Sequence, residues 1–242
     1  EESLPALVDL IDSWRERVNN SPAAAGGAEG SGSWLPLDQQ DAFIITYGDQ
    51  FHGPQEMPLE YLHRFFSERL EGIVSGIHIL PFFPYSSDDG FSIIDYRLVN
   101  PEWGTWEQIR EISQGFRLMA DLVLNHCSVK SEWFKEFLNG TPPYDRYFIE
   151  VDPQADISSV FRPRAHPLLT PFQGSDGEKL VWTTFSADQA DLNFAEPQVM
   201  LEMLDIFLFY LSQGVQVLRL DAIAYLWKEF GTPCLHHPKT HL

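Results

Sequence analysis

The sequence predicts an α/β fold, the first half of a (β/α)8 barrel (strands one to four), because short apolar segments alternate with helical ones. The strand-like segments are apolar throughout, which is typical of a parallel sheet covered on both faces. A proline-rich interval of about seventy residues after His126 exceeds a plain loop and indicates a subdomain inserted after the third strand. A complete barrel needs about 250 residues, whereas roughly 140 remain for the strand–helix units once the N-terminal segment and the insertion are set aside. Only half of a barrel therefore fits here. A complete doubly wound sheet is the alternative.

The N-terminal segment predicts one helix followed by a linker. Residues 4–18 predict an amphipathic helix, because apolar side chains recur on one stripe: Leu4, Leu7, Val8, Ile11 and Trp14. Residues 19–33 are rich in Gly, Ala, Ser and Pro, a composition that predicts a flexible linker or a disordered insert.

Alternating strands and helices follow. Strands are expected at residues 42–46, 76–82, 117–124 and 215–220, and helices at residues 59–70, 106–113 and 198–212. Gly115 and Gly214 are expected to close the second and the third of these helices. The third helix should bury one face, formed by Val199, Met203, Ile206 and Tyr210.

These elements divide the chain into four segments. The N-terminal helix and linker occupy residues 1–40, the first part of the barrel residues 41–130, the inserted subdomain residues 131–195, and the continued barrel residues 196–242. An open half-barrel would leave strand edges exposed. We therefore expect the chain to be the N-terminal part of a longer protein.

Composition argues against several classes of function. The net charge of −19 repels phosphate backbones, so nucleic acid is not an expected partner. No apolar run approaches the ~20 residues that span a bilayer, and the first residues do not resemble a signal peptide. We therefore expect a cytoplasmic protein without a membrane partner. Cys127 and Cys234 are too few for a disulfide framework.

Polar side chains end two of the predicted strands. Arg219 and Asp221 lie two residues apart, so they project from the same face of their strand. A guanidinium beside a carboxylate keeps that carboxylate ionised, as a nucleophile requires. Residues 121–126 also end an apolar run in polar groups. The two strand ends therefore predict one shared active-site face.

These strand ends carry a resemblance to a known family. Residues 121–126 (Asp-Leu-Val-Leu-Asn-His) and 218–222 (Leu-Arg-Leu-Asp-Ala) resemble successive signatures of the α-amylase superfamily, glycoside hydrolase family 13. Within it, further segments resemble the sucrose phosphorylase group: residues 44–49, 78–84, 88–91, 161–164, 180–185 and 228–232. Residues 167–170 and 191–193 look more like the glucosylglycerate and glucosylglycerol phosphorylases. The resemblance covers about residues 41–242.

The resemblance implies a role for nine residues. Asp221 would be the nucleophile, forming a covalent glucosyl ester, and Arg219 would hold it ionised and oriented. Arg164 and Tyr225 would contact phosphate, for which a planar guanidinium is well suited. The residues that bind the sugar or line its site would be Asp88, Phe91, His126, Phe185 and Gln189.

Simpler interpretations stand beside these roles. Asp221 could cap the following helix, Asp88 could belong to an ordinary turn, and Arg164 could be a solvated loop residue. Asp121 is expected to be architectural rather than catalytic. Asn125 resembles a calcium ligand of many amylases, but the phosphorylase group generally lacks that site, so neither metal nor cofactor is expected.

The resemblance implies a retaining glucoside phosphorylase whose substrates are a small α-glucoside, such as sucrose or glucosylglycerate, and inorganic phosphate. Its product would be α-glucose 1-phosphate. The family's acid/base glutamate and a further aspartate follow later strands and would lie beyond Leu242, so the fragment alone should be inactive. The alternatives are a hydrolase or transglucosylase of the same superfamily, or a catalytically dead fragment kept for binding.

Overall fold

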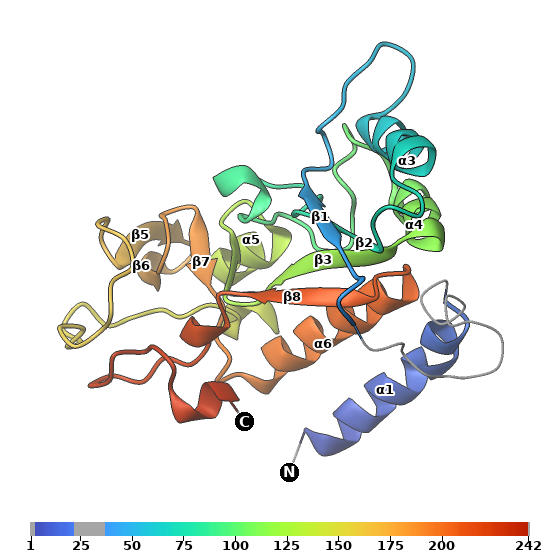
Figure 1. Cartoon of the computed structure of the whole chain (residues 1–242). Coiled ribbons are helices and arrows are strands. Elements are labelled where there is room, and N and C mark those ends of the chain that lie inside the picture. The colour runs from blue at the N-terminus through green and yellow to red at the C-terminus, as the bar shows by residue number, and fades with distance from the viewer. Residues whose placement is uncertain (1–2, 22–36, 242) are drawn as a thin grey trace. The chain divides into compact units, whose positions relative to one another are not determined.

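The computed structural model describes residues 3–21 and 37–241, and its elements are labelled in Figure 1. The chain divides into two compact units, each of which combines segments that are far apart in the sequence. Unit 1 holds Glu1–Pro84, Tyr96–Leu122 and Leu204–Arg219, and unit 2 holds Tyr85–Asp95, Val123–Met203 and Leu220–Leu242. The chain therefore passes repeatedly from one unit to the other.

Unit 1 is built on a sheet with four strands in the described part of the chain. Its strands are β1 (Phe43–Thr46), β2 (Gly76–Ile79), β3 (Arg117–Val123) and β8 (Val217–Asp221), paired in the order β1-β2-β3-β8. The last residues of two of these strands, β3 and β8, belong to unit 2. β1 pairs with β2, and β2 with β3, in parallel. A doubly wound sheet reverses its strand order at a switch point, whereas these described strands follow chain order. The sheet therefore fits part of an α/β barrel.

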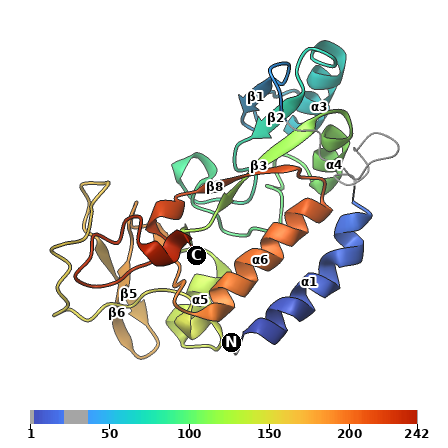
Figure 2. The same ribbon diagram turned by 60° about the horizontal axis from the view of Figure 1, so that its bottom comes forward.

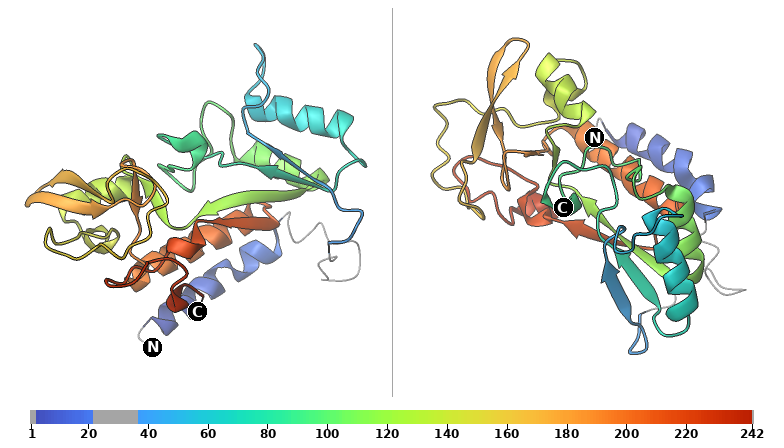
Figure 3. Two further views of the ribbon diagram at one scale, coloured as in Figure 1. Left: turned by 60° about the vertical axis from the view of Figure 1, so that its left-hand side comes forward. Right: turned by 90° about the horizontal axis from the view of Figure 1, so that it is seen from above.

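Two helices of unit 1 cover this sheet. They are α3 (Pro58–Arg69) and α4 (Trp106–Gly115), which lie side by side in the right-hand view of Figure 3. Each buries one apolar face, as its periodicity predicts. The buried apolar residues are Leu59, Leu62, Phe66, Ile109 and Ile112.

The N-terminal helix packs against a second long helix. Figure 2 shows α1 (Leu4–Asn19) alongside α6 (Pro197–Ser212), whose C-terminal half belongs to unit 1. The Trp14 indole N–H donates to Asp205 Oδ1 at 2.6 Å, and the Trp14 ring meets Phe209 edge-on at 6.3 Å between centroids. Trp14 therefore anchors α1 by one polar and one apolar contact.

The predicted apolar stripe of α1 is only partly buried. Trp14 is the one buried residue of this helix, whereas Leu4 is 59%, Val8 48% and Ile11 42% exposed. The helix itself is confirmed, and the structure buries only Trp14 of its apolar stripe. The predicted inner face of α6 is confirmed, because all four of its residues are buried: Val199, Met203, Ile206 and Tyr210.

Several element boundaries differ from the prediction. β2 ends at Ile79 rather than at residue 82, and Pro81 has no N–H with which to continue the pairing. The fourth strand begins two residues late because the Val215 N–H bonds to the carbonyl of α6 residue Tyr210 at 3.1 Å. Gly214, at φ 101°, ends α6 as predicted. Gly115 instead is the last residue of α4, and Phe116 follows as its cap.

Two further predictions change. The sheet is not covered throughout, because Ile45 of β1 is 65% and Leu220 of β8 is 44% exposed. Both lie on strands at the ends of the strand order, so the all-apolar pattern overestimates their burial. Within the predicted linker, Asn19 ends α1 and Ser21 is buried, while residues 22–33 lie outside the described residues.

Unit 2 combines short strands with helix α5 (Glu132–Asn139) and the N-terminal part of α6. β4 (His126–Ser128) pairs antiparallel with β7 (Gln189–Asp191), and β5 (Leu169–Gly174) forms a hairpin with β6 (Gly177–Trp182). Ser131 caps the N-terminus of α5, because its hydroxyl accepts the Phe134 N–H. Short 3-10 turns lie at Asp88–Gly90, Tyr144–Arg146, Ile223–Tyr225 and Pro238–His241.

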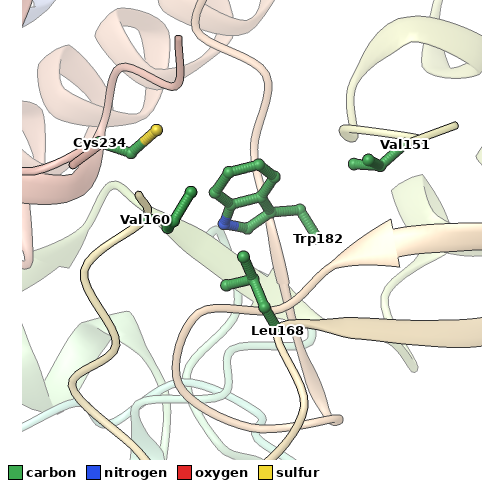
Figure 4. Packing of buried hydrophobic residues seen from close by; sticks show 5 residues of the cluster. All are labelled: Val151, Val160, Leu168, Trp182 and Cys234. Carbon is green, nitrogen blue, oxygen red and sulfur yellow. The ribbon is translucent and has the colours of Figure 1, made fainter. Parts of the chain in front are cut away.

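An apolar cluster holds unit 2 together around Trp182. Figure 4 shows it with Val151, Val160, Leu168 and Cys234, all buried. Cys234 comes from the segment after β8, so this segment is part of the core of unit 2.

Among the described residues, no helix has both the length and the apolar character needed to cross a bilayer.

Candidate active site

A buried carboxylate in unit 1 joins three neighbouring strands. Asp121 of β3 is fully buried, and its two oxygens contact His78 Nε2 of β2 at 2.7 Å and Arg219 Nη1 of β8 at 2.5 Å. A buried charge without partners is costly, so this pairing explains how Asp121 is accommodated. The architectural role predicted for Asp121 fits this geometry, and sequence reasoning missed His78 as a partner.

The predicted role of Arg219 is to orient Asp221, two residues along β8. The structure pairs the Arg219 guanidinium with Asp121 and leaves the Arg219 side chain 44% exposed. The pairing fixes the guanidinium of Arg219 at β3. Its action on Asp221 stays a prediction.

The chain turns sharply just after Asp221, the predicted nucleophile. Ala222 has φ 55°, in the left-handed region that non-glycine residues rarely adopt. The Tyr225 N–H then bonds to the Ala222 carbonyl at 3.1 Å and closes a short 3-10 turn. Strained residues of this kind cluster at functional sites. The turn places Tyr225, a predicted phosphate ligand, one turn away from Asp221.

Four predicted sugar-binding residues lie together in unit 2. Gln189 of β7 donates from Nε2 to Asp88 Oδ2 at 2.9 Å, and the same nitrogen lies 3.1 Å from His126 Nε2. His126 Nε2 lies 3.2 Å from the Phe91 carbonyl oxygen. Gln189 and His126 are buried, whereas Asp88 is exposed. After their predicted role, we call these four residues, Asp88, Phe91, His126 and Gln189, the sugar-binding group.

His126 is held as a neutral imidazole. Burial lowers the pKa of His126, and the charges of Asp191 and Asp221 oppose this only in part. Asp221 is thus close enough to His126 to act on it. The Asn125 amide nitrogen lies 3.4 Å from His126 Nδ1 and the Gln189 amide nitrogen 3.1 Å from His126 Nε2, so an amide donor faces each ring nitrogen. A neutral imidazole suits hydrogen bonding to a sugar hydroxyl.

Aromatic rings link this group to the predicted phosphate ligands. The Phe185 ring lies 5.1 Å from His126 and meets Tyr225 edge-on, also at 5.1 Å. Burial raises the pKa of Tyr225, and the nearby charge of Arg164 lowers it. Tyr225 therefore stays protonated at neutral pH and close to Arg164. The neighbouring Arg162 instead donates to the His166 carbonyl.

A buried charge network beside the site was not predicted. The Lys228 ammonium lies 2.7 Å from Asp191 Oδ2 and 2.7 Å from Asn125 Oδ1. The Asn125 amide donates to Asp191 Oδ2 at 2.9 Å, and Thr184 donates to Asp191 from its backbone and its hydroxyl. Burial lowers the pKa of Lys228, which Asp191 opposes. Lys228 lies within a segment that carries the resemblance, and this was the only signal for it.

The structure thus brings the predicted site residues of unit 2 into one connected set. Contacts run from Asp88 through Gln189 and His126 to Phe185 and Tyr225, and the charge of Arg164 acts on Tyr225. A cavity of about 70 Å³ between Trp182, Trp227 and Phe230 is lined by none of them. Among the described residues, no group of three or more His, Cys, Asp or Glu is arranged to hold a metal ion.

Comparison with known proteins identifies relatives of this chain. The family description "Alpha amylase, catalytic domain" matches residues 66–241. A glucosylglycerate phosphorylase of Spirochaeta thermophila is 62% identical over 98% of this chain and 39% of its own length. A glucosylglycerate phosphorylase of Escherichia coli K12 is 51% identical over 85% of this chain and 37% of its own length. The chain spans about two fifths of the length of these curated relatives.

Solved structures agree in fold. The crystal structure of sucrose 6F-phosphate phosphorylase from Thermoanaerobacter thermosaccharolyticum superposes with a TM-score of 0.77 at 30% identity. The match covers 86% of this chain and 44% of that one. Together with the sequence match over residues 66–241, this shows that the chain belongs to the α-amylase catalytic-domain family.

Proposed function

We propose that this chain forms the glucosyl-binding and nucleophile-bearing part of a retaining glucoside phosphorylase. The complete enzyme transfers an α-glucosyl group to inorganic phosphate and releases α-glucose 1-phosphate. The connected set from Asp88 to Arg164 is the observation that carries this proposal, because it joins sugar-binding groups to an anion-binding pair. Relatives at 62%, 56% and 51% identity are named glucosylglycerate phosphorylases, so we propose glucosylglycerate as the glucosyl donor.

The sugar-binding group matches the needs of a pyranose ring. The Asp88 carboxylate can accept hydrogen bonds from the sugar hydroxyls. The buried His126, as a neutral imidazole, can donate a hydrogen bond from one ring nitrogen and accept one at the other. The rings of Phe91 and Phe185 offer apolar surfaces to the C–H faces of a sugar. We place the glucosyl ring against these residues, with its anomeric carbon toward Asp221.

The nucleophile acts from the end of β8. Asp221 attacks the anomeric carbon, the glycosidic bond breaks, and a covalent glucosyl ester forms; phosphate then displaces Asp221 with a second inversion. Protonation of the leaving oxygen needs a second carboxyl group. We assign that acid/base to the part of the relatives' length that this chain does not span.

The phosphate site involves Tyr225 and Arg164. Tyr225 stays protonated, because burial raises its pKa. Its hydroxyl can therefore donate a hydrogen bond to a phosphate oxygen. Arg164 is exposed and adds a guanidinium that can donate two parallel bonds. Since Arg162 is engaged by the His166 carbonyl, Arg164 is the arginine of this loop that we assign to phosphate.

We further propose that residues 131–195 are a subdomain inserted into the barrel. This segment holds α5, the β5–β6 hairpin and β7, between the two barrel strands β3 and β8. It contributes Arg164, Phe185 and Gln189 to the connected set. The insertion thus carries part of the site.

The experiment uses a chimera in which residues 1–242 are followed by the part of the S. thermophila relative that this chain does not span. We expect it to convert glucosylglycerate and phosphate to α-glucose 1-phosphate, whereas residues 1–242 alone give no turnover. Asp221→Asn in the chimera should lower kcat by about 10⁴-fold, because an amide cannot form the ester. Asp156→Asn, an exposed aspartate of unit 2, is the matched control.

The products separate the alternatives. Release of free glucose at a rate independent of phosphate would show a hydrolase, and transfer to a second sugar would show a transglucosylase. A folded chimera that binds the donor without turnover would favour a non-catalytic role. Full activity of the Asp221→Asn variant would contradict the assigned nucleophile.

A further inference from the structure

A cluster of hydroxyl groups holds the loop that carries Asp88. The side chains of Ser86, Ser87 and Ser92 all donate to one oxygen of Asp188, Oδ2, at 2.5, 2.5 and 2.9 Å. All of these residues belong to unit 2, and Asp188 directly precedes Gln189. One carboxylate oxygen therefore receives hydrogen bonds from both ends of the loop.

The hydrogen bonds of this cluster have a consistent direction. Ser128 accepts the Lys130 N–H at 2.9 Å, so its own hydroxyl proton is available for Ser86, 2.5 Å away. Ser86 is then free to donate to Asp188. The backbone of Asp188 is fixed as well, because its carbonyl accepts the Val129 N–H at 3.0 Å. The chain of hydrogen bonds from Ser128 through Ser86 ends at the Asp188 carboxylate, which acts as the acceptor.

The loop that this cluster holds is strained. Asp88 and Asp89 follow each other with φ 57° and 49°, both in the left-handed region. Non-glycine residues persist there only where their surroundings fix them. At the base of the loop, the Ser86 N–H bonds to the Ser92 carbonyl at 3.0 Å. The bonds to Asp188 therefore act on the two ends of a strained turn.

We propose that Asp188 is the positioning residue of the sugar-binding group. Its carboxylate holds the Ser86–Ser92 loop in the strained turn that presents Asp88 and Phe91 to the glucosyl ring. The adjacent Gln189 fixes the tip of the loop through its bond to Asp88 Oδ2. This inference rests on the proposed glucosyl-binding role of Asp88, and it assigns to Asp188 no contact with the sugar itself.

The first test is Asp188→Asn in the chimera. The amide keeps the shape of the carboxylate but loses its charge, and charge-assisted hydrogen bonds are about twice as strong as neutral ones. We expect KM to rise about tenfold for glucosylglycerate and for α-glucose 1-phosphate, while KM for phosphate changes less than about twofold. A purely structural loss would lower apparent kcat through a smaller folded fraction and leave every KM unchanged.

A double substitution tests whether Asp188 acts through Asp88. In an Asp88→Ala chimera, adding Asp188→Asn should raise the donor KM by clearly less than tenfold, because Asp88, one of the two groups that it positions, is gone and only Phe91 remains. Asp156→Asn is the matched control, since Asp156 bonds to the Ser158 N–H within its own turn. A full tenfold effect in the Asp88→Ala background would overturn the proposal.

Hydrogen exchange tests the positioning role without turnover. In residues 1–242, Asp188→Asn should speed amide exchange at Phe91 and Ser92, whose N–H groups bond within the loop, by about tenfold relative to Asp156→Asn. Unchanged exchange would overturn the positioning role even if the chimera is active. An inactive chimera with this faster exchange would contradict the proposed function and leave the positioning of the loop standing.

Discussion

Lys228 and Asp191 form an ion pair at 2.7 Å in which both side chains are buried. The pair connects β7 to the segment after β8, and Asn125 of the segment after β3 joins it through both polar atoms of its amide. Three segments that carry site residues are thus tied at one point. The pair lies beside the sugar-binding group, because Asn125 is next to His126 and Asp191 is two residues from Gln189.

Removing Lys228 should destabilise the protein strongly. Lys228→Met leaves the Asp191 charge buried without its partner, which costs about 3–5 kcal/mol. Urea unfolding followed by circular dichroism measures the loss. Lys135→Met is the matched control, because Lys135 pairs with Glu132 at the surface with 59% of its side chain exposed; it should change stability by less than about 0.5 kcal/mol. Equal losses for the two variants would contradict the importance of the buried pair.

Arg164→Ala in the chimera should affect phosphate more than the sugar. We expect KM for phosphate to rise about tenfold or more, with hydrolysis of the donor nearly unchanged, because a charged hydrogen-bond donor to phosphate is lost. Initial rates at varied phosphate measure this effect. Arg162→Ala is the control from the same loop, since its guanidinium bonds to the His166 carbonyl. Parallel losses of phosphorolysis and hydrolysis would remove the phosphate role of Arg164.

Acidification should destabilise the protein through His126. Burial lowers the pKa of His126 in the folded state, so between that value and about 6.5 the unfolded chain binds a proton that the folded chain does not. Stability therefore falls as the pH drops from about 6.5 towards the lowered pKa of the folded state. Unfolding at several pH values, compared between the wild type and His126→Gln, isolates this effect. A pH dependence that is identical in both would contradict it.

The thiol of Cys127 should be unreactive in the folded protein. Burial raises its pKa to about 12. At pH 8 its thiolate is therefore about a thousandfold scarcer than that of an ordinary cysteine. In a Cys234→Ser variant, a disulfide reagent such as DTNB should react slowly until a denaturant is added. Fast labelling under native conditions would show that Cys127 is accessible.

Trp14→Ala should release helix α1. Trp14 is the one buried side chain of α1, and it carries the indole bond to Asp205 and the contact with Phe209. We expect a loss of about 2–4 kcal/mol and early proteolytic cleavage within residues 4–19. Leu4→Ala, at a position that is 59% exposed, is the control. If both variants resist protease equally, contacts other than those of Trp14 hold the helix.

The order of the elements could be predicted from the sequence because the patterns that define them are local. Apolar periodicity placed α6 and its buried face correctly, and alternation of strands and helices indicated the parallel sheet. The exposure of Ile45 and Leu220 could not be predicted, because burial of an outer strand depends on its neighbours and not on its own residues.

The site was predictable only where residues lie within recognisable segments. Asp88, His126 and Gln189 came from a resemblance, and their mutual contacts join residues up to 101 positions apart. Lys228 and Asp188 received no role, because a single charged residue in a sequence looks like one at the surface. Their partners are 37 or more positions away in the chain, so no local pattern marks them as buried or bonded.

The composition of unit 2 has a consequence for how the chain folds. Its core includes Cys234, and the Phe161 N–H bonds to the carbonyl of Pro233. During synthesis, the β5–β6 hairpin can form as soon as residue 182 has left the ribosome, since its contacts are local. The apolar cluster around Trp182 must wait some fifty residues longer for its last member, Cys234. The surface that holds Phe185 and Tyr225 in contact is thus completed late, after the last segment of unit 1 has been translated.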